Sequence, residues 1–438
     1  MEWAQQFIGP NSKGPAPASA GDVVQAGNVV YVRELEDKWI LSQMPEVSGA
    51  LVSLDPETGA IYSLTGGFDY YLSKFNRATQ ALRQPGSNIK PFIYSAALDN
   101  GFTPASLVSA APIVVEDDLE GVWRPQNYSK KFFGPTRLRK ALSLSLNLVS
   151  VRLLRAMGMD ATIDHLEKFG FDPEELPRNL SLALGSTQVT PLDLAASFAV
   201  LANGGYLISP YLIESITDAE GNPFPLPPCD DCNRDLIKAE VLEVTGEIED
   251  ELAESGAEGE AQESDNNGNS ERESTRTISA QNAYLTTSML KQVIRSGTGR
   301  RALALNRTDL AGKTGTTNDF RDAWFSGYSP DVITTVFIGF DEPSHLGNRE
   351  SGASAALPIW VDYMGLALRD YPEQPEVIPD NITTRFINAD TALVTSPDDP
   401  DGYTEHYELG SEPNNLVDNS SQGTQSSGQG EDVTESLF

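Results

Sequence analysis

The period of apolar and polar positions changes along the chain from that of a strand to that of a helix and back. Residues 51–54 and 60–64 are short apolar runs on either side of a turn sequence at 55–59, which predicts a β-hairpin. Residues 87–205 alternate helical segments with glycine turns, and short strands are predicted again between 311 and 340. Strands from both ends of the chain around a helical middle indicate an α+β fold.

Proline, glycine and charge divide the chain further. Residues 1–48 are assigned to a Pro-, Gly- and Ser-rich linker and a small β module predicted from the apolar runs at 29–32 and 39–41. The main domain is predicted over 49–380, interrupted by an acidic low-complexity insert at 229–276. A C-terminal β extension is expected at 381–415 and a disordered acidic tail at 416–438.

One serine and one lysine stand three residues apart at the start of an apolar helix. Pro85-Gly86 is a turn signal, so the helix is predicted from about Ser87, and Pro91 is tolerated near a helix start. Positions i and i+3 share a helix face, and a helix that is apolar all round is buried. Because burial lowers the pKa of a lysine, we expect Lys90 to act as a general base for the Ser87 hydroxyl.

The same S-x-x-K spacing at Ser288 and Lys291 shows that the spacing alone is a weak signal. In that segment Leu285, Met289 and Val293 form the predicted buried stripe. Ser288 and Lys291 are therefore expected on a solvated helix face, without a chemical role.

Two further motifs follow Ser87. Ser145 and Asn147 interrupt an apolar segment, and buried polar groups require partners, although local capping between two helices is an alternative. The run Lys313-Thr314-Gly315-Thr316 predicts a strand that another backbone approaches closely at its glycines. Its open edge suits an extended peptide and its lysine suits a carboxylate, while an ordinary glycine-containing strand is the alternative.

In this order, S-x-x-K, S-x-N and K-T-G resemble the signature of penicillin-recognising serine acyltransferases. The runs FNRATQ at 75–80 and DAWFSGY at 322–328 narrow the resemblance to the transpeptidase domain of class A penicillin-binding proteins, over about residues 27–413 apart from the insert. The resemblance implies a five-stranded antiparallel sheet with helices on both faces. It also implies a cleft between that sheet and a helical subdomain.

The resemblance also implies a role for each motif residue. Ser87 would attack a D-Ala–D-Ala stem peptide of peptidoglycan, and β-lactams would acylate the same serine. The other roles are Lys90 as base, Ser145 as proton relay, Asn147 as support for Lys90 and the substrate amide, Lys313 as positive charge, Thr314, Gly315 and Thr316 as substrate-binding positions, and the backbone N–H groups of Ser87 and Thr316 as oxyanion hole. No metal or other cofactor is implied.

The motifs leave other functions open. A β-lactamase shares them but needs an efficient deacylating water and its base, for which the sequence offers no clear candidate. A D,D-carboxypeptidase uses the same serine chemistry with water as acceptor. A penicillin-binding sensor would signal upon acylation and form no crosslink. The sequences at 75–80 and 322–328, which resemble those of class A penicillin-binding proteins, favour the transpeptidase.

The formal net charge of −32 is concentrated in two tracts. Residues 240–276 hold thirteen acidic and two basic residues, and residues 396–438 hold ten acidic residues without Lys or Arg. Such composition predicts partial disorder, and the acidity argues against a nucleic-acid partner.

Targeting signals bear on where the protein acts. No segment resembles a signal peptide or a bilayer span. The membrane-anchored class A penicillin-binding proteins that the sequence resembles carry an N-terminal anchor helix and a glycosyltransferase domain before the matching region. We therefore expect a truncated chain that acts at the periplasmic face of the bacterial inner membrane, without glycosyltransferase activity in these residues.

Cysteine and histidine are sparse. Cys229 and Cys232 form a proline-flanked C-x-x-C, for which a local disulfide in an oxidising compartment is favoured over free thiols, a redox pair or a zinc site. His165 falls in an amphipathic helix and is expected to be structural, because Lys90 already supplies a base.

Overall fold

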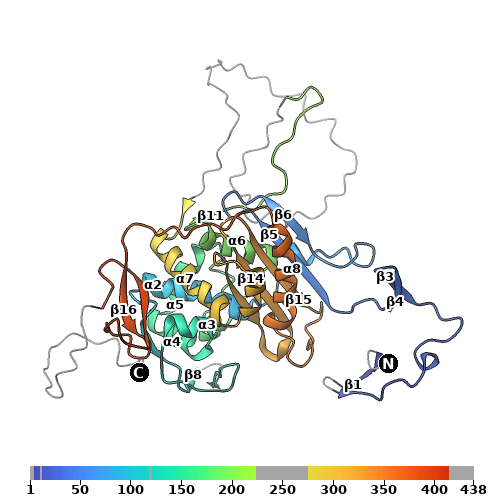
Figure 1. Cartoon of the computed structure of the whole chain (residues 1–438), viewed down its shortest axis with the longest axis horizontal. Helices are drawn as coiled ribbons and strands as arrows, with labels where there is room; N and C mark the ends of the chain where they lie inside the picture. The colour runs from blue at the N-terminus through green and yellow to red at the C-terminus, as the bar shows by residue number, and fades with distance from the viewer. Residues whose placement is uncertain (1–3, 10–11, 118–120, 223–274, 414–438) are drawn as a thin grey trace.

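A computed structural model describes residues 4–9, 12–117, 121–222 and 275–413. Its centre is one antiparallel sheet built from two parts of the chain, residues 48–65 and 311–339 (Figure 1). The strand order is β13 (Ala311–Thr316), β14 (Asp322–Tyr328), β15 (Ile333–Gly339), β5 (Ser48–Leu54) and β6 (Ile61–Thr65). The predicted hairpin is β5–β6, and β15 pairs with β5 in the register Val336 opposite Leu51. The predicted α+β fold with a five-stranded antiparallel sheet is confirmed.

Both faces of the sheet are apolar. Successive strand residues point to opposite sides, and each side carries buried apolar side chains. Trp324 and Phe337 belong to the core on the side of α6, and Phe325 and Val336 to the core on the side of α8. Helix α6 (Pro191–Ala202) packs on β5, β14 and β15, while α8 (Leu357–Ala367) covers β14 and β15 with Trp360 in its contact. The sheet is thus buried between two helical layers.

The predicted helical subdomain is built around α2. Eight of the ten residues of α2 are buried, as its apolar sequence predicts, and α4, α5 and α7 pack against it. The helices of this part are α2 (Lys90–Asp99), α3 (Leu138–Ser143), α4 (Asn147–Met157), α5 (Met159–Glu167) and α7 (Ala280–Ser296). The short helix α1 (Arg77–Gln80) instead contacts β5, β6 and α6. Among the helices of the described residues, none has the length and apolar character needed to span a bilayer.

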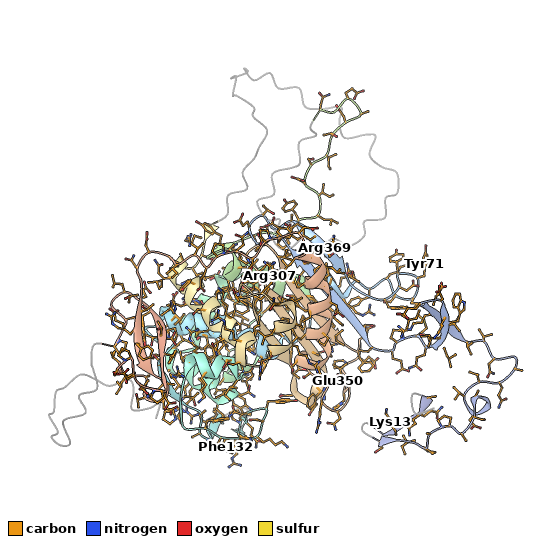
Figure 2. All side chains as sticks on the ribbon, in the orientation of Figure 1. Lys13, Tyr71, Phe132, Arg307, Glu350 and Arg369 are labelled. Carbon is orange, nitrogen blue, oxygen red and sulfur yellow. The ribbon has the colours of Figure 1, made fainter. Side chains whose placement is uncertain are left out.

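Short two-stranded pairs complete the described structure. They are β1 (Phe7–Gly9) with β2 (Ser12–Lys13), β3 (Tyr31–Leu35) with β4 (Lys38–Ser42), β7 (Leu107–Ser109) with β10 (Pro135–Arg137), β8 (Val115–Asp117) with β9 (Gly121–Trp123), β11 (Tyr206–Leu207) with β12 (Thr275–Arg276), and β16 (Ile382–Asn388) with β17 (Gly402–Glu408). The pair β3–β4 projects away from the main body (Figure 1). Tyr71, which is 95% exposed, also points outward (Figure 2).

Most of the predicted acidic insert, with Cys229 and Cys232, lies outside the described residues. Its last two residues, Thr275 and Arg276, form β12 and pair with β11. The Arg276 guanidinium donates to the Gly204 carbonyl and stacks 4.2 Å from the ring centroid of Tyr206. The chain therefore rejoins the domain beside the strand that it left.

Candidate active site

Ser87 lies in a short 3₁₀ turn, η3 (Gly86–Ile89), directly before α2 and not in the α-helix itself. Residues i and i+3 of a 3₁₀ turn also lie on the same side, so Ser87 and Lys90 still share a face. Ser87 is partly exposed, whereas Lys90 is fully buried. The turn therefore presents a hydroxyl at the surface and an amino group beneath it.

Lys90 is held by neutral oxygens. Its Nζ donates to the Ser145 carbonyl at 2.8 Å, the Ser145 hydroxyl at 3.3 Å and Asn147 Oδ1 at 2.6 Å, and none of its hydrogen bonds in the described chain goes to Ser87. No carboxylate of the described residues forms an ion pair with it. Burial lowers the pKa of Lys90 well below its usual range, and the nearby Lys313 lowers it further.

Ser145 and Asn147 are fixed by the junction between α3 and α4. Ser145 has a φ of 56°, a left-handed conformation that costs a non-glycine residue about 1 kcal/mol or more and persists only where the surroundings enforce it. Asn147 begins α4, its Nδ2 donates to the Gln126 carbonyl at 2.8 Å and its backbone N–H donates to Asn127 Oδ1 at 2.9 Å. The neighbouring loop thus aims Asn147 Oδ1 at Lys90.

Lys313 completes the polar cluster from the edge strand of the sheet. Its Nζ donates to the Ser145 hydroxyl at 2.9 Å and to the Thr314 carbonyl at 3.0 Å. Burial lowers the pKa of Lys313 to about 7. The Ser145 hydroxyl accordingly lies between two buried amino groups, with its own proton free to be donated.

The turn that carries Ser87 is pressed against β13. A Cβ at Gly86, whose φ is +54°, would lie 2.7 Å from the Thr316 carbonyl oxygen, and one at Gly315 would lie 2.5 Å from the Pro85 carbonyl oxygen. The close backbone approach predicted at the strand glycines is confirmed. It brings the backbone of Thr316 beside that of Ser87.

The prediction for the second S-x-x-K pair was wrong in one respect. Lys291 is buried, with 9% exposed, and its Nζ forms an ion pair with Glu376 at 2.8 Å. Ser288 Oγ accepts from Arg139 at 2.9 Å. This face of α7 is covered by chain that comes after β15, which the local apolar stripe does not reveal.

Sequence reasoning missed several groups that support the site. Gln126 and Asn127 orient Asn147, and Thr298 Oγ1 lies 2.6 Å from Thr314 Oγ1. The signals were faint: an amide pair ahead of S-x-N, and a threonine flanked by two glycines ahead of K-T-G.

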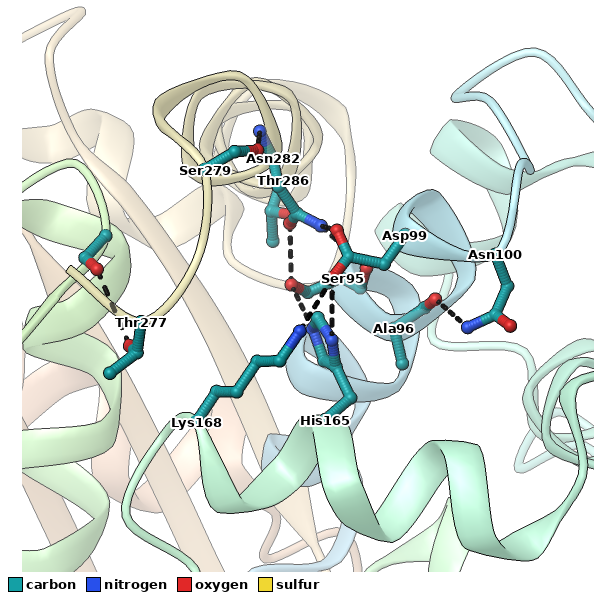
Figure 3. A network of polar contacts seen from close by, with 11 residues as sticks. Ser95, Ala96, Asp99, Asn100, His165, Lys168, Thr277, Ser279, Asn282 and Thr286 are labelled. Atoms are coloured by element: carbon teal, nitrogen blue, oxygen red, sulfur yellow. Dashed lines mark hydrogen bonds and ion pairs between the residues drawn. The ribbon is translucent and has the colours of Figure 1, made fainter.

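His165 is buried at the other end of α2, in a separate network that reaches the surface at Asp99 and Lys168 (Figure 3). Ser95 Oγ lies 2.9 Å from His165 Nε2 and donates to Asn282 Oδ1 at 2.6 Å. Asp99 Oδ2 lies 3.1 Å from both His165 Nδ1 and Lys168 Nζ. These contacts join α2, α5 and α7, so His165 holds helices together.

The sheet, its two helical layers and the three motifs at one sheet edge are those of the penicillin-binding transpeptidase fold. Residues 49–359 match the family of the penicillin-binding protein transpeptidase domain, and residues 1–47 match the penicillin-binding protein OB-like domain. The chain belongs to the penicillin-binding proteins.

Individual relatives are similar over nearly the whole chain. Penicillin-binding protein 1A of Pseudomonas aeruginosa is 48% identical over 422 residues, which are 93% of this chain and 51% of the relative. That of Escherichia coli K12 is 38% identical over 449 residues, covering 90% of this chain and 51% of the relative. The chain therefore spans about half the length of the curated relatives it matches.

Solved structures agree with this fold. The crystal structure of penicillin-binding protein 1A from Haemophilus influenzae has a TM-score of 0.76 and 36% identity, and the match covers 90% of this chain and 58% of that one. PonA1 from Mycobacterium tuberculosis in complex with penicillin V shares the fold at a TM-score of 0.60 and 24% identity, over 77% of this chain and 82% of that one.

Proposed function

We propose that the chain is a serine D,D-transpeptidase that crosslinks peptidoglycan stem peptides through an acyl-enzyme on Ser87. β-Lactams acylate the same serine, and the reaction takes place on the periplasmic side of the bacterial inner membrane. One observation carries the proposal: a partly exposed serine precedes a buried lysine whose neighbours are a second lysine and neutral oxygens, without a carboxylate from the described chain.

Acylation follows from that arrangement. Neutral Lys90 takes the Ser87 proton as Oγ attacks the carbonyl carbon of the penultimate D-alanine. Backbone N–H groups of Ser87 and Thr316 stabilise the oxyanion, a contribution of roughly 3–4 kcal/mol per donor in comparable enzymes. As the C–N bond breaks, Ser145 gives its proton to the departing D-alanine amine and receives the former Ser87 proton from Lys90, which is neutral again.

Deacylation completes the crosslink. The amine of a neighbouring stem peptide attacks the ester carbonyl and gives a proton to neutral Lys90. As the ester C–O bond breaks, Lys90 passes that proton to Ser87 Oγ. Before that, in the acylation step, Lys313 and the hydroxyls of Thr314 and Thr316 hold the carboxylate of the terminal D-alanine until this residue departs. The Thr316 hydroxyl accepts from the Gly352 N–H at 3.0 Å, which leaves its proton available for that anion.

The test is a donor–acceptor assay with the purified chain. A pentapeptide donor and a D-amino acid acceptor are incubated, and exchange and hydrolysis products are quantified by mass spectrometry. Exchange in excess of hydrolysis is expected, and Ser87→Ala should yield neither product. Hydrolysis alone would show a carboxypeptidase, and acylation without any turnover would show a sensor; either result contradicts the transpeptidase.

A further inference from the structure

A short turn links the two sides of the candidate site. Helix α7 ends at Ser296, and the following Thr298 N–H donates to the Ser143 carbonyl at 3.2 Å. A Cβ at Gly297 would lie 2.2 Å from that same carbonyl oxygen, so the turn is pressed against the loop that carries Ser145. On its other side Thr298 Oγ1 lies 2.6 Å from Thr314 Oγ1 on β13.

The two threonine hydroxyls constrain each other. Each hydroxyl has one proton and two acceptor positions. Within the described residues neither Oγ1 has another hydrogen-bond partner, so one of them donates and the other keeps a free proton. If Thr298 donates, the proton of Thr314 points away from Thr298 and is available to an anion beside β13.

We propose that Thr298 is a positioning residue that orients the Thr314 hydroxyl toward the carboxylate of the acyl donor. The inference rests on the proposed function, because it assigns the carboxylate to Thr314. Thr298 does not touch the substrate. It acts by donating its own hydroxyl proton to Thr314 Oγ1, which leaves the Thr314 proton directed away from Thr298. The Thr314 hydroxyl is then a preset donor instead of a free rotor, and substrate binding has less entropy to remove.

The test compares Thr298→Val, which keeps the branched shape and the backbone N–H, with Thr298→Ser, which keeps the hydroxyl. The second-order acylation constant is measured for a penicillin with a free carboxylate and for its methyl ester. Thr298→Val should lower the constant for the acid by about three- to tenfold, the cost of ordering one side chain upon binding, and leave the ester nearly unchanged. Thr298→Ser should restore the acid value.

A double mutant tests whether Thr298 acts through Thr314. Thr298→Val should have no further effect in a Thr314→Val background, because the oriented hydroxyl is already absent. Equal losses in both backgrounds would overturn the inference, as would equal losses for acid and ester.

Controls separate this inference from the proposed function. Thr162→Val removes a buried hydroxyl that donates to the Gly158 carbonyl at 2.8 Å in α5, and it should leave the acid-to-ester ratio unchanged. Melting temperatures of all variants identify losses caused by unfolding. If wild-type Ser87 is not acylated, the proposed function fails; if it is acylated and Thr298→Val keeps the wild-type ratio, only the role of Thr298 fails.

Discussion

The two ends of α2 carry two polar clusters with opposite character, one buried and one that reaches the surface at Asp99. At the N-terminal end Lys90 and Lys313 share the hydroxyl of Ser145, and their partners are neutral oxygens. At the C-terminal end Ser95, His165 and Asp99 stand in the order of a serine-protease triad (Figure 3). By residue type alone, the second cluster is the more familiar catalytic arrangement.

Hydrogen-bond direction rules out a nucleophile at Ser95. The Asn282 Nδ2 donates to the Ser95 carbonyl at 2.9 Å and to Asp99 Oδ1 at 2.6 Å, so Asn282 Oδ1 must face the Ser95 hydroxyl. The single proton of that hydroxyl is given to Asn282, so Ser95 does not donate to His165 Nε2, which lies 2.9 Å away. Ser95 is also fully buried, so no substrate reaches it.

Charge explains the rest of the difference. Burial alone raises the pKa of Asp99, but hydrogen bonds from His165, Asn282 and Lys168 lower it well below its usual range. That carboxylate is satisfied and inert. Lys90 has no such counter-charge in the described chain, so burial and Lys313 favour its neutral form. The reactivity proposed for the first end therefore rests on a buried neutral amine that follows a partly exposed hydroxyl.

Removing the nucleophile gives the largest expected effect. Ser87→Ala should abolish covalent labelling by a fluorescent penicillin, whereas Ser95→Ala, at the other end of α2, should retain one adduct per chain. Intact-mass spectrometry measures both, and peptide mapping locates the adduct. Stoichiometric labelling of Ser87→Ala would falsify the assignment of the nucleophile.

Removing the base should have the next largest effect. Lys90→Ala is expected to lower the acylation rate constant by about 10²–10⁴-fold, the usual contribution of general-base catalysis, while the drug still binds reversibly. Lys168→Ala removes the lysine that contacts Asp99 and should leave the constant unchanged. Stopped-flow fluorescence measures both variants. Comparable losses would mean that the two clusters work as one unit.

Lys313 should affect charged donors selectively. Lys313→Ala is expected to reduce the acylation constant for a carboxylate substrate by about one to two decades, the loss of a charge-assisted hydrogen bond, and to affect the matched ester far less. Lys313→Arg should recover only part of the activity, because a planar guanidinium does not replace a compact ammonium. Equal losses for acid and ester would leave proton transfer through Ser145 as its main role.

The pH dependence sharpens this expectation. With a pKa of about 7, Lys313 is charged below that pH and neutral above it. The second-order constant reports the free enzyme, so the preference for acid over ester should decline as the pH rises through about 7. The rate with the ester should instead rise with pH until Lys90 is neutral. The range from about pH 6 to about pH 8 extends roughly one unit on either side of the Lys313 pKa. A preference for the acid that stays constant over this range would contradict a titrating Lys313.

The motifs and the fold class could be predicted because their signals are local. Each of these signals spans only a few residues: the hairpin at 51–64, the apolar α2 and the three motifs S-x-x-K, S-x-N and K-T-G. The order of the motifs is read directly from the chain. The burial of Lys291 could not be predicted, since Glu376 comes from a distant segment. The partners of Ser95 and Thr298 are also set by tertiary packing, which places hydroxyls from different elements within 3 Å of their partners.

Stability should respond in the opposite order from activity. Ser95→Ala leaves His165 Nε2 without its buried partner and leaves Asn282 Oδ1 with Thr286 alone, and should lower the free energy of unfolding by about 1–3 kcal/mol. Lys90→Met removes the hydrogen bonds to Asn147 Oδ1 and the Ser145 carbonyl but also removes a buried amine that has no counter-charge in the described chain, so a smaller loss is expected. Urea unfolding of both variants measures this. A larger destabilisation from Lys90→Met would show that the catalytic end also holds the fold.

The smallest effect is expected from the acidic insert, which rejoins the fold near the C-terminal cluster. Strand β12 leads into α7, whose Asn282 closes the network around Ser95. Pairing of Leu207 with Thr275 places the two sides of the excursion next to each other, and loop length changes closure entropy only slowly. Replacing 229–274 with a short Gly-Ser linker should therefore keep the acylation constant within a few-fold of wild type. A collapse in that constant would show that the insert contacts the domain and supports the site. If Ser95→Ala is still active, that support does not pass through the network around Ser95.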